Sequence, residues 1–224
     1  MFADRSILIT GASAGLGAAL AQALAAQGAR LTLMARRADR LQEVVEACQE
    51  VGGKAQAVVG DVTQPEDGVR LTQVALEAYG AIDGLIANAG LSMWARFDEV
   101  EDVSVFRRLM EVNYLGAVHC LHPAMPHLKK SRGMFVAISS IQGRIGVPHH
   151  TGYVASKHAL QGLCDALRME VADDGVAVLS VLLHWLRGTE LREHAFGADG
   201  EAMGTSRRKH SSESIGLDEA CVQI

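Results

Sequence analysis

The sequence predicts an α/β fold built on a parallel sheet with helices on both faces. Short aliphatic or β-branched runs alternate with longer segments of helical period along the chain, and this alternation is typical of parallel strands joined by helical crossovers. Several of the short runs are apolar throughout, as strands covered on both faces must be. The 224 residues suit one full-sized domain. We therefore expect a single domain over residues 1–224 with the doubly wound strand order 3-2-1-4-5-6.

The elements follow in order along the chain. The uncharged stretch from Ser6 to Ala29 begins as a strand-like run and changes to helical period at Gly17, so it predicts a strand and a helix rather than a membrane span or a signal sequence. The expected strands are Ser6–Thr10, Arg30–Ala35, Ala55–Gly60, Ile82–Ala87, Met134–Ser139 and Val176–Leu183. The expected helices are Gly15–Gln27, Ala38–Val51, Pro65–Tyr79, Val103–Leu128 and Gly152–Asp173.

The last part of the chain departs from this alternation. Residues from Gly197 to Gly216 are rich in Gly, Ser and charge and poor in apolar side chains, which is typical of a long mobile loop. Within it, Arg207-Arg208-Lys209 is expected to be a solvated charge run. Leu217–Ile224 then begins an amphipathic helix with apolar residues at i, i+3, i+4 and i+7. Because the chain stops there, we expect a truncated carboxyl end.

Composition argues against several function classes. The chain has 21 Lys and Arg against 26 Asp and Glu, a net charge of −5, which offers no basic field for nucleic acid or anionic lipid. Cys48, Cys120, Cys164 and Cys221 show neither C-x-x-C pairing nor zinc-ligand spacing, so we expect reduced thiols and no metal site. These features favour a cytoplasmic protein without nucleic-acid or membrane partners.

A glycine-rich turn joins the first strand to the first helix. Its sequence is Thr10-Gly11-Ala12-Ser13-Ala14-Gly15-Leu16-Gly17. Gly11 would allow a sharp exit from the strand, Gly15 would let a pyrophosphate approach the backbone, and Gly17 would let helix and strand pack closely. The helix N-terminus offers free N–H groups and a partial positive charge to phosphates. A turn without a ligand is the alternative, but the flanking strand and helix favour a dinucleotide site of the Rossmann type.

The residues after the next two strands indicate which dinucleotide is bound. Arg36 and Arg37 follow the second strand, where an NAD-binding protein would place an acid against the ribose 2′-hydroxyl. Paired guanidinium groups can hold a 2′-phosphate, so NADP(H) is favoured over NAD(H), although two surface arginines are the plain alternative. Asp61-Val62 suits a contact with the adenine edge, and a turn or cap is nearly as good an explanation for Asp61.

Tyr153 and Lys157 stand at i, i+4 at the start of a predicted helix, so they share one face. A nearby ammonium stabilises a phenolate, and we expect Lys157 to lower the pKa of Tyr153 and let it transfer protons near neutrality. Ser140 follows the fifth strand at the sheet edge where α/β folds bind ligands. Taken singly, a Tyr and Lys pair is usually surface decoration and a serine at a strand end is usually part of a turn.

Together these motifs resemble the classical type of the short-chain dehydrogenase/reductase family. The turn matches its T-G-x-x-x-G-x-G motif, Ala87-Asn88-Ala89-Gly90 matches its N-N-A-G with the first Asn replaced, and Tyr153 with Lys157 matches its Y-x-x-x-K. Asp61, Asn113 and Ser140 fall at further motif positions of the family. The match runs from about Ser6 to Glu190, most of the chain.

The resemblance implies a hydride-transfer site. Tyr153 would exchange a proton with the substrate oxygen, Ser140 would orient that oxygen, Lys157 would hold the nicotinamide ribose, and Asn113 would keep a water in a proton path. The expected cofactor contacts are Gly11, Ser13, Gly15, Leu16, Gly17, Arg36, Arg37, Asp61, Val62, Asn88, Ala89, Gly90, Tyr153 and Lys157.

Three features depart from the family pattern. His184-Trp185 replaces the usual Pro-Gly after the sixth strand, and Trp185 is bulky enough to crowd the cofactor. Ala14 stands where NADP-preferring members often carry a basic residue, so Arg36 and Arg37 would act alone. The family's seventh strand has no counterpart in the sequence. A non-catalytic NADP(H)-binding sensor or interaction protein is therefore the alternative to an NADP(H)-dependent carbonyl reductase or alcohol dehydrogenase.

The remaining expectations concern substrate and assembly. The expected substrate contacts are Trp94, Gln142, Ile145, His150 and Trp185. A loop over about 189–216 is expected to cover them. Their largely apolar character favours a moderately apolar carbonyl compound or alcohol as the small-molecule substrate. Helices Val103–Leu128 and Gly152–Asp173 carry broad apolar faces, which family members commonly pair across a two-fold axis, so a homodimer or homotetramer is expected.

Overall fold

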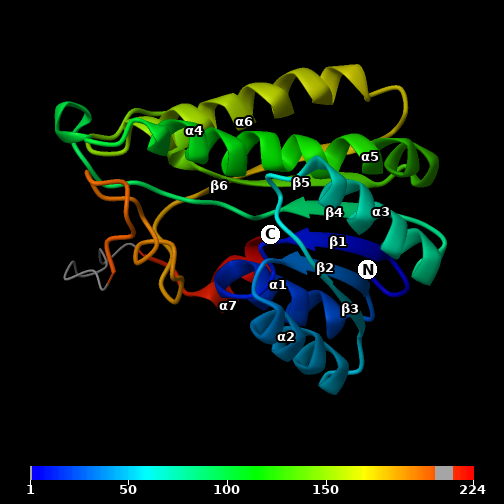
Figure 1. Cartoon of the computed structure of the whole chain (residues 1–224). Coiled ribbons are helices and arrows are strands. Elements are labelled where there is room, and N and C mark those ends of the chain that lie inside the picture. Colours follow the sequence, from blue (N-terminus) through cyan, green and yellow to red (C-terminus); the bar gives the residue numbers. More distant parts are fainter. Residues whose placement is uncertain (1, 205–213) are drawn as a thin grey trace.

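The computed structural model describes residues 2–204 and 214–224, and its centre is a six-stranded parallel sheet with helices on both faces (Figure 1). The strand order is β3-β2-β1-β4-β5-β6, which confirms the doubly wound prediction. The strands are β1 Ser6–Thr10, β2 Arg30–Ala35, β3 Lys54–Val59, β4 Gly84–Ala87, β5 Met134–Ser140 and β6 Ala177–Leu183. The α-helices are α1 Gly15–Ala25, α2 Ala38–Glu50, α3 Pro65–Tyr79, α4 Ser104–Met110, α5 Gly116–Ser131, α6 Thr151–Glu170 and α7 Leu217–Gln223.

Alternation along the central strand divides the core into two layers. Ile7 and Ile9 of β1 pack with α1, α2 and α7 on one face of the sheet, whereas Leu8 packs with α3, α5 and α6 on the other. All five residues of β1 are buried, because β1 pairs with β2 on one side and with β4 on the other. This burial accounts for the uninterrupted apolar run in the sequence.

The topology places a crevice at the carboxyl ends of the strands. The chain order reverses between β1 and β4, which are neighbours in the sheet, and ligands of doubly wound sheets bind at this switch point. The glycine turn after β1, Asn88 after β4 and Ser140 at the end of β5 all lie at this edge.

One segment predicted as a single helix is interrupted in the structure. The segment expected as Val103–Leu128 consists of α4, a π-helical turn over Glu111–Leu115, and α5. The π-turn carries Asn113, whose side chain bonds to groups outside the helix, and such turns often occur at functional sites. Most other predicted boundaries agree with the structure to within one to three residues.

The described part of the C-terminal region folds back onto the domain. Leu186 pairs with Ile215, and Phe196 pairs with Met93 and Ala202, through isolated β-bridges. The predicted helix at the end of the chain is confirmed as α7, which buries Ala220 against the α1 side of the core. Arg207-Arg208-Lys209 lies outside the described residues, and among those described β6 is the last strand. None of the helices within residues 2–204 and 214–224 combines the length and the apolar character needed to cross a membrane.

Candidate active site

A cavity of about 1430 Å³ opens at the carboxyl edge of the sheet. It runs from the glycine turn and Arg36 at one end to Ser140, Tyr153 and Lys157 at the other. The structure therefore brings most of the residues that the sequence motifs select together along one cavity, whereas Gly17 and Asn113 lie outside its lining.

The glycine turn is held by close backbone approach. Gly11 has a φ of +64°, and a Cβ there would lie 2.8 Å from Ala89 Cα. A Cβ on Gly17 would lie 2.5 Å from both Gly11 O and Asn88 Nδ2. Only glycine fits these positions without displacing backbone. Gly17 thus allows the close packing expected of it, and the positive φ of Gly11 agrees with the sharp exit expected there.

Hydrogen bonds join this turn to the turn after β4. Asn88 Nδ2 donates to Thr10 O at 3.0 Å and to Gly11 O at 3.2 Å. Thr10 Oγ1 accepts from the backbone N–H groups of Asn88 and Ala89 at 3.1 Å. Helix α1 then starts beside the cavity with no side chain capping its N-terminus. Its first N–H groups are therefore available to an anion such as a phosphate.

Charged side chains gather where β2 and β3 end. Arg36 Nη1 lies 3.8 Å from Asp61 Oδ2, and Arg37 Nη2 donates to Ser13 Oγ at 3.4 Å. Asp61 Oδ1 also accepts from the backbone N–H and the hydroxyl of Thr63, both at 3.0 Å. Asp61 thus shapes the turn after β3 and also faces Arg36.

Tyr153, Ser140 and Lys157 meet at the buried end of the cavity. The Ser140 side chain lies close enough to the Tyr153 phenol to lower its pKa, against the larger effect of burial. Ser140 Oγ also donates to Leu183 O at 3.3 Å and accepts from Gln142 N at 3.2 Å. Lys157 Nζ donates to Ile138 O at 2.9 Å and lies 5.7 Å from the centre of the Tyr153 ring.

Burial controls the protonation of this group. It raises the pKa of Tyr153 to about 12, opposed by the Ser140 side chain, and it lowers the pKa of Lys157 to about 8. The expected lowering of the Tyr153 pKa by Lys157 is therefore wrong for the protein alone, because desolvation disfavours the phenolate and the ammonium faces Ile138 O. At neutral pH the phenol carries its proton.

Asn113 joins three parts of the site. Its Nδ2 donates to Leu91 O at 2.9 Å and to Ser156 Oγ at 2.8 Å, and its Oδ1 accepts from Leu91 N at 2.8 Å. A Cβ on Gly90 would lie 3.4 Å from Asn113 Oδ1 and 3.8 Å from Lys157 Nζ. The amide hydrogens are thus committed to protein partners, and Asn113 fixes the turn after β4 relative to α6.

Most of the expected substrate contacts share one cavity wall. Trp94, Gln142, His150 and Trp185 line the cavity, and the His150 ring lies 4.7 Å from Trp94, 6.1 Å from Tyr153 and 6.4 Å from Trp185, between ring centres. Buried Gln142 Oε1 has no hydrogen-bond partner among the described residues. Ile145 is half exposed and lies outside the cavity lining, so its expected substrate contact is wrong for this conformation.

Two further charged residues near the site, Glu190 and Arg40, are not evident from the sequence motifs. Glu190, which lines the cavity, pairs with Arg37 and with Arg40 of α2. The i, i+3 spacing of Arg37 and Arg40 is visible in the sequence, but Glu190 lies about 150 residues away along the chain. Only the fold reveals this pairing.

Comparison with known proteins gives consistent matches. Residues 5–198 match the family described as short chain dehydrogenase. Two curated relatives are 11-beta-hydroxysteroid dehydrogenase-like 4A of Arabidopsis thaliana, 39% identical over 77% of this chain and 58% of the relative, and 11-beta-hydroxysteroid dehydrogenase A of Arachis hypogaea, 38% identical over 80% and 52%. The chain therefore spans little more than half the length of these relatives.

A solved structure is similar over nearly the whole chain. The alcohol dehydrogenase of the archaeon Thermococcus sibiricus, complexed with 5-hydroxy-NADP, superimposes with a TM-score of 0.82 and is 28% identical. The alignment covers 98% of this chain and 88% of that structure.

Lys157→Met tests the buried ammonium. Burial lowers the pKa of Lys157 from 10.5 to about 8, so between these pH values the unfolded chain binds more protons than the folded chain, and stability should rise with pH. This contribution amounts to about 3 kcal/mol. Buried Cys48, Cys120 and Cys164, whose pKa values are raised, lower stability with pH in both proteins. In urea unfolding, the stability of the wild type relative to Lys157→Met should therefore rise between pH 8 and 10.5.

Lys54→Met is the matched control, because Lys54 is an exposed lysine at the start of β3. This variant should keep the pH dependence of the wild type. Equal pH dependence in Lys157→Met and the wild type would contradict a desolvated ammonium at this site.

Proposed function

Because the chain belongs to the short-chain dehydrogenase/reductase family, we propose that it is an NADP(H)-dependent oxidoreductase that interconverts a carbonyl and a secondary alcohol. The observation that carries the proposal is the meeting of Ser140, Tyr153 and Lys157 at one end of a cavity whose other end is an uncapped helix N-terminus. One end suits proton transfer to a substrate oxygen, and the other suits a phosphate.

The residues present fit a nicotinamide dinucleotide. Gly11 and Gly17 let the turn after β1 lie against the turn after β4, and the backbone of Ser13, Gly15 and Leu16 at the cavity wall would hold the pyrophosphate. Asp61 and Val62 would contact the adenine, and Arg36 and Arg37 the 2′-phosphate. Asn88, Ala89 and Gly90 would lie along the ribose side, and Lys157 Nζ lies 3.8 Å from the Cβ position of Gly90.

The protein's own groups would handle the proton and the substrate oxygen. The bound nicotinamide supplies or accepts the hydride. Tyr153, protonated at neutral pH because burial raises its pKa, donates its proton to the carbonyl oxygen during reduction. The Ser140 hydroxyl holds that oxygen in place, and Lys157 provides positive charge beside the developing alkoxide.

The substrate end of the cavity favours an apolar compound. Trp94, Val147 and Trp185 give it apolar and aromatic walls, with Gln142 as a polar group. The names of the plant relatives refer to hydroxysteroids, which agrees with a moderately apolar alcohol or ketone. Four free thiols, three of them buried, support a reducing compartment, and we propose the cytoplasm.

Tyr153→Phe tests the proposed reaction. Loss of the phenolic proton should lower the turnover of ketones with NADPH by about 10²- to 10⁴-fold. NADPH affinity, measured by fluorescence on binding, should stay within a few-fold of the wild type. Full activity in this variant would contradict the assignment. If the wild type binds NADPH but turns over no member of a ketone panel, the sensor alternative is favoured.

Arg36→Asp tests the cofactor preference. Reversing this charge should raise the Kd for NADPH by about 10- to 100-fold, because it replaces an attraction to the 2′-phosphate by a repulsion. The Kd for NADH should change far less. Arg107→Asp makes the same charge change on an exposed residue of α4 outside the cavity lining and serves as the control. Equal losses for NADPH and NADH would refute the preference.

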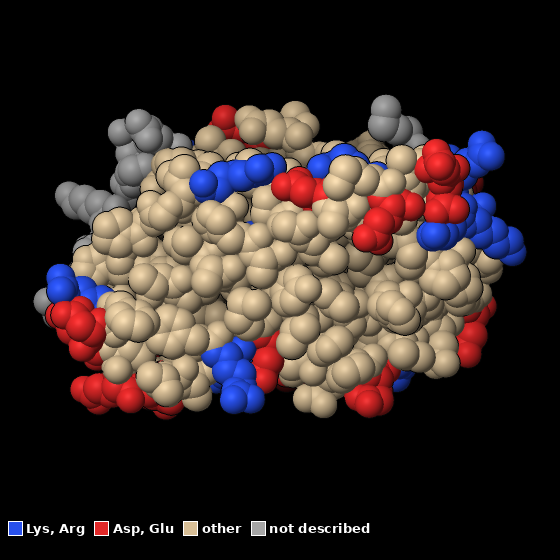
Figure 2. Space-filling view, turned by 90° about the horizontal axis from the view of Figure 1, so that it is seen from above, with Lys and Arg blue, Asp and Glu red and all other residues tan. Residues whose placement is uncertain are grey.

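We also propose that the chain forms a homodimer or homotetramer through the α5 and α6 side. Figure 2 shows a broad area without Lys, Arg, Asp or Glu on this side of the molecule. The exposed positions of α6 include small or uncharged residues, among them Ala155, His158 and Ala166. Such a surface suits close packing against a second copy.

Sedimentation should therefore give a dimer or a tetramer. Ala166→Glu should shift the protein toward monomer, because it places a charge within the contact. Gln22→Glu, on the exposed side of α1, should leave the assembly unchanged. A wild-type monomer would count against this interface.

A further inference from the structure

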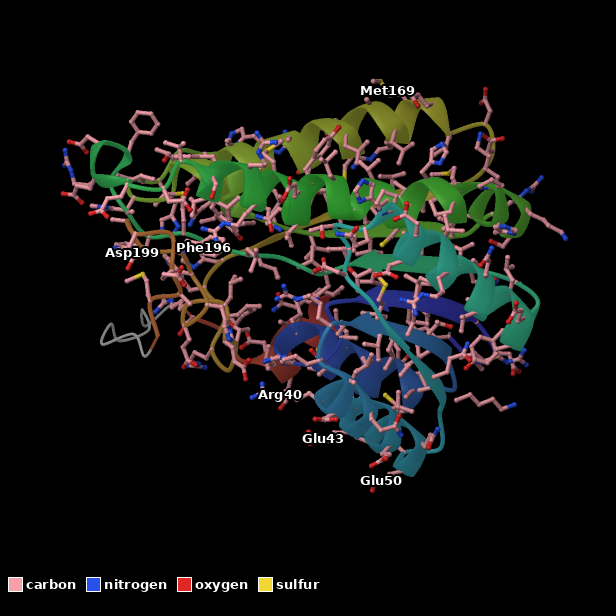
Figure 3. All side chains as sticks on the ribbon, in the orientation of Figure 1. Arg40, Glu43, Glu50, Met169, Phe196 and Asp199 are labelled. Carbon is pink, nitrogen blue, oxygen red and sulfur yellow. The ribbon has the colours of Figure 1, made fainter. Side chains whose placement is uncertain are left out.

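One carboxylate bridges two arginines at the mouth of the cavity. Glu190 Oε2 accepts from Arg37 Nη1 at 3.0 Å, and Glu190 Oε1 accepts from Arg40 Nη1 at 2.6 Å. Arg37 precedes α2 and Arg40 lies in its first turn, whereas Glu190 belongs to the segment after β6. Figure 3 shows Arg40 at the end of α2 that faces this segment.

The bridge lies beside the phosphate-binding turn. Thr189, the neighbour of Glu190, is so close to this turn that a Cβ on Gly15 would lie 3.6 Å from Thr189 Cγ2. Arg37 Nη2 bonds to Ser13 Oγ in the same turn. Thus Glu190 lies where a cofactor's adenosine phosphates would enter, and it holds the guanidinium group proposed to bind the 2′-phosphate.

The bonding of Arg37 engages both of its terminal nitrogens. A guanidinium group binds phosphate best through two parallel N–H groups. In Arg37 both terminal nitrogens already have partners, Glu190 on Nη1 and Ser13 on Nη2. The two arginines hold the pKa of Glu190 below its usual value, so the carboxylate is charged at neutral pH.

The local charge leads to the same conclusion. Arg36, Arg37 and Arg40 are paired with two carboxylates, Asp61 and Glu190. A 2′-phosphate, with a charge of about −2, would have to displace Glu190 or share its arginines while repelling it. A 2′-hydroxyl would meet no such competition.

We infer that Glu190 is a specificity-determining residue that competes with the cofactor 2′-phosphate for Arg37 and Arg40. Glu190 weakens the binding of 2′-phosphorylated cofactor and leaves the binding of the unphosphorylated form unchanged. This inference rests on the proposed preference for NADP(H). It assigns to one side chain on the segment after β6 the degree of that preference.

The test measures binding of the adenosine half of the cofactor, without turnover. Titration calorimetry with 2′,5′-ADP and with 5′-AMP at low salt compares the wild type with Glu190→Gln. The variant should bind 2′,5′-ADP about 3- to 10-fold more tightly and 5′-AMP unchanged, because the Arg37 and Arg40 donors become available. The gain should shrink at high salt, because the Glu190 carboxylate and its partners are about one third to one half exposed.

Two further variants make the result specific. Glu193→Gln removes the same charge from an exposed residue in the same segment and should leave both affinities unchanged. Arg37→Ala should weaken 2′,5′-ADP by about tenfold or more and 5′-AMP far less.

Each other outcome overturns a stated part of the argument. Unchanged or weaker 2′,5′-ADP binding in Glu190→Gln overturns the inference, as does an equal gain in Glu193→Gln. Weaker binding of both nucleotides in Glu190→Gln also overturns it, and would mean that the Glu190 bridge stabilises the cavity for either nucleotide. If the wild type does not distinguish the two nucleotides and Arg37→Ala changes neither affinity, the proposed cofactor preference fails and the inference fails with it.

Discussion

The contact between the turns after β1 and β4 is the constraint on which the rest of the site depends. Asn88 donates to the carbonyls of Thr10 and Gly11, and the Thr10 hydroxyl accepts from the turn after β4. The absence of a Cβ at Gly11 and Gly17 is what permits this approach. The contact continues through Leu91 to Asn113, and from Asn113 through Ser156 to the carbonyl of Tyr153. One path of hydrogen bonds therefore fixes the phosphate end of the cavity relative to the Tyr153 end.

The two ends of the cavity use electrostatics in opposite ways. At the outer end, Arg37, Arg40 and Glu190 are partly exposed, and the Glu190 carboxylate offsets part of the positive charge of the two arginines. A small change in charge there therefore changes mainly the affinity for a ligand. At the inner end, Tyr153 and Lys157 are buried. Desolvation raises the pKa of Tyr153 and lowers the pKa of Lys157, and both shifts favour the neutral form of the side chain. The outer end is therefore suited to selecting a ligand, and the inner end to controlling a proton.

The sequence predicts the framework well because its signals are local. The apolar runs of β1 and β2 lie between turn residues, and Pro65 opens α3, so these three elements have the predicted bounds. The π-turn at Asn113 is not predictable from periodicity, because it goes with hydrogen bonds to Leu91 and Ser156, which lie elsewhere in the chain. The pairing of Glu190 with α2 and the raised pKa of Tyr153 also depend on residues far apart in the chain.

The inner end also bears on whether the cavity serves catalysis or only binding. Keeping a lysine whose pKa is lowered to about 8 in the core costs about 3 kcal/mol relative to a solvated one, and an apolar side chain of similar length would pack there without that cost. A fold that only had to bind adenosine and phosphates would gain nothing from this arrangement, because the outer end supplies those contacts. A buried ammonium beside a protonated phenol and a hydrogen-bonded serine gains value when negative charge develops on an oxygen between them. The stability cost at Lys157 therefore indicates that this end of the cavity holds a ligand group that uses a nearby positive charge, which agrees with the proposed reacting centre.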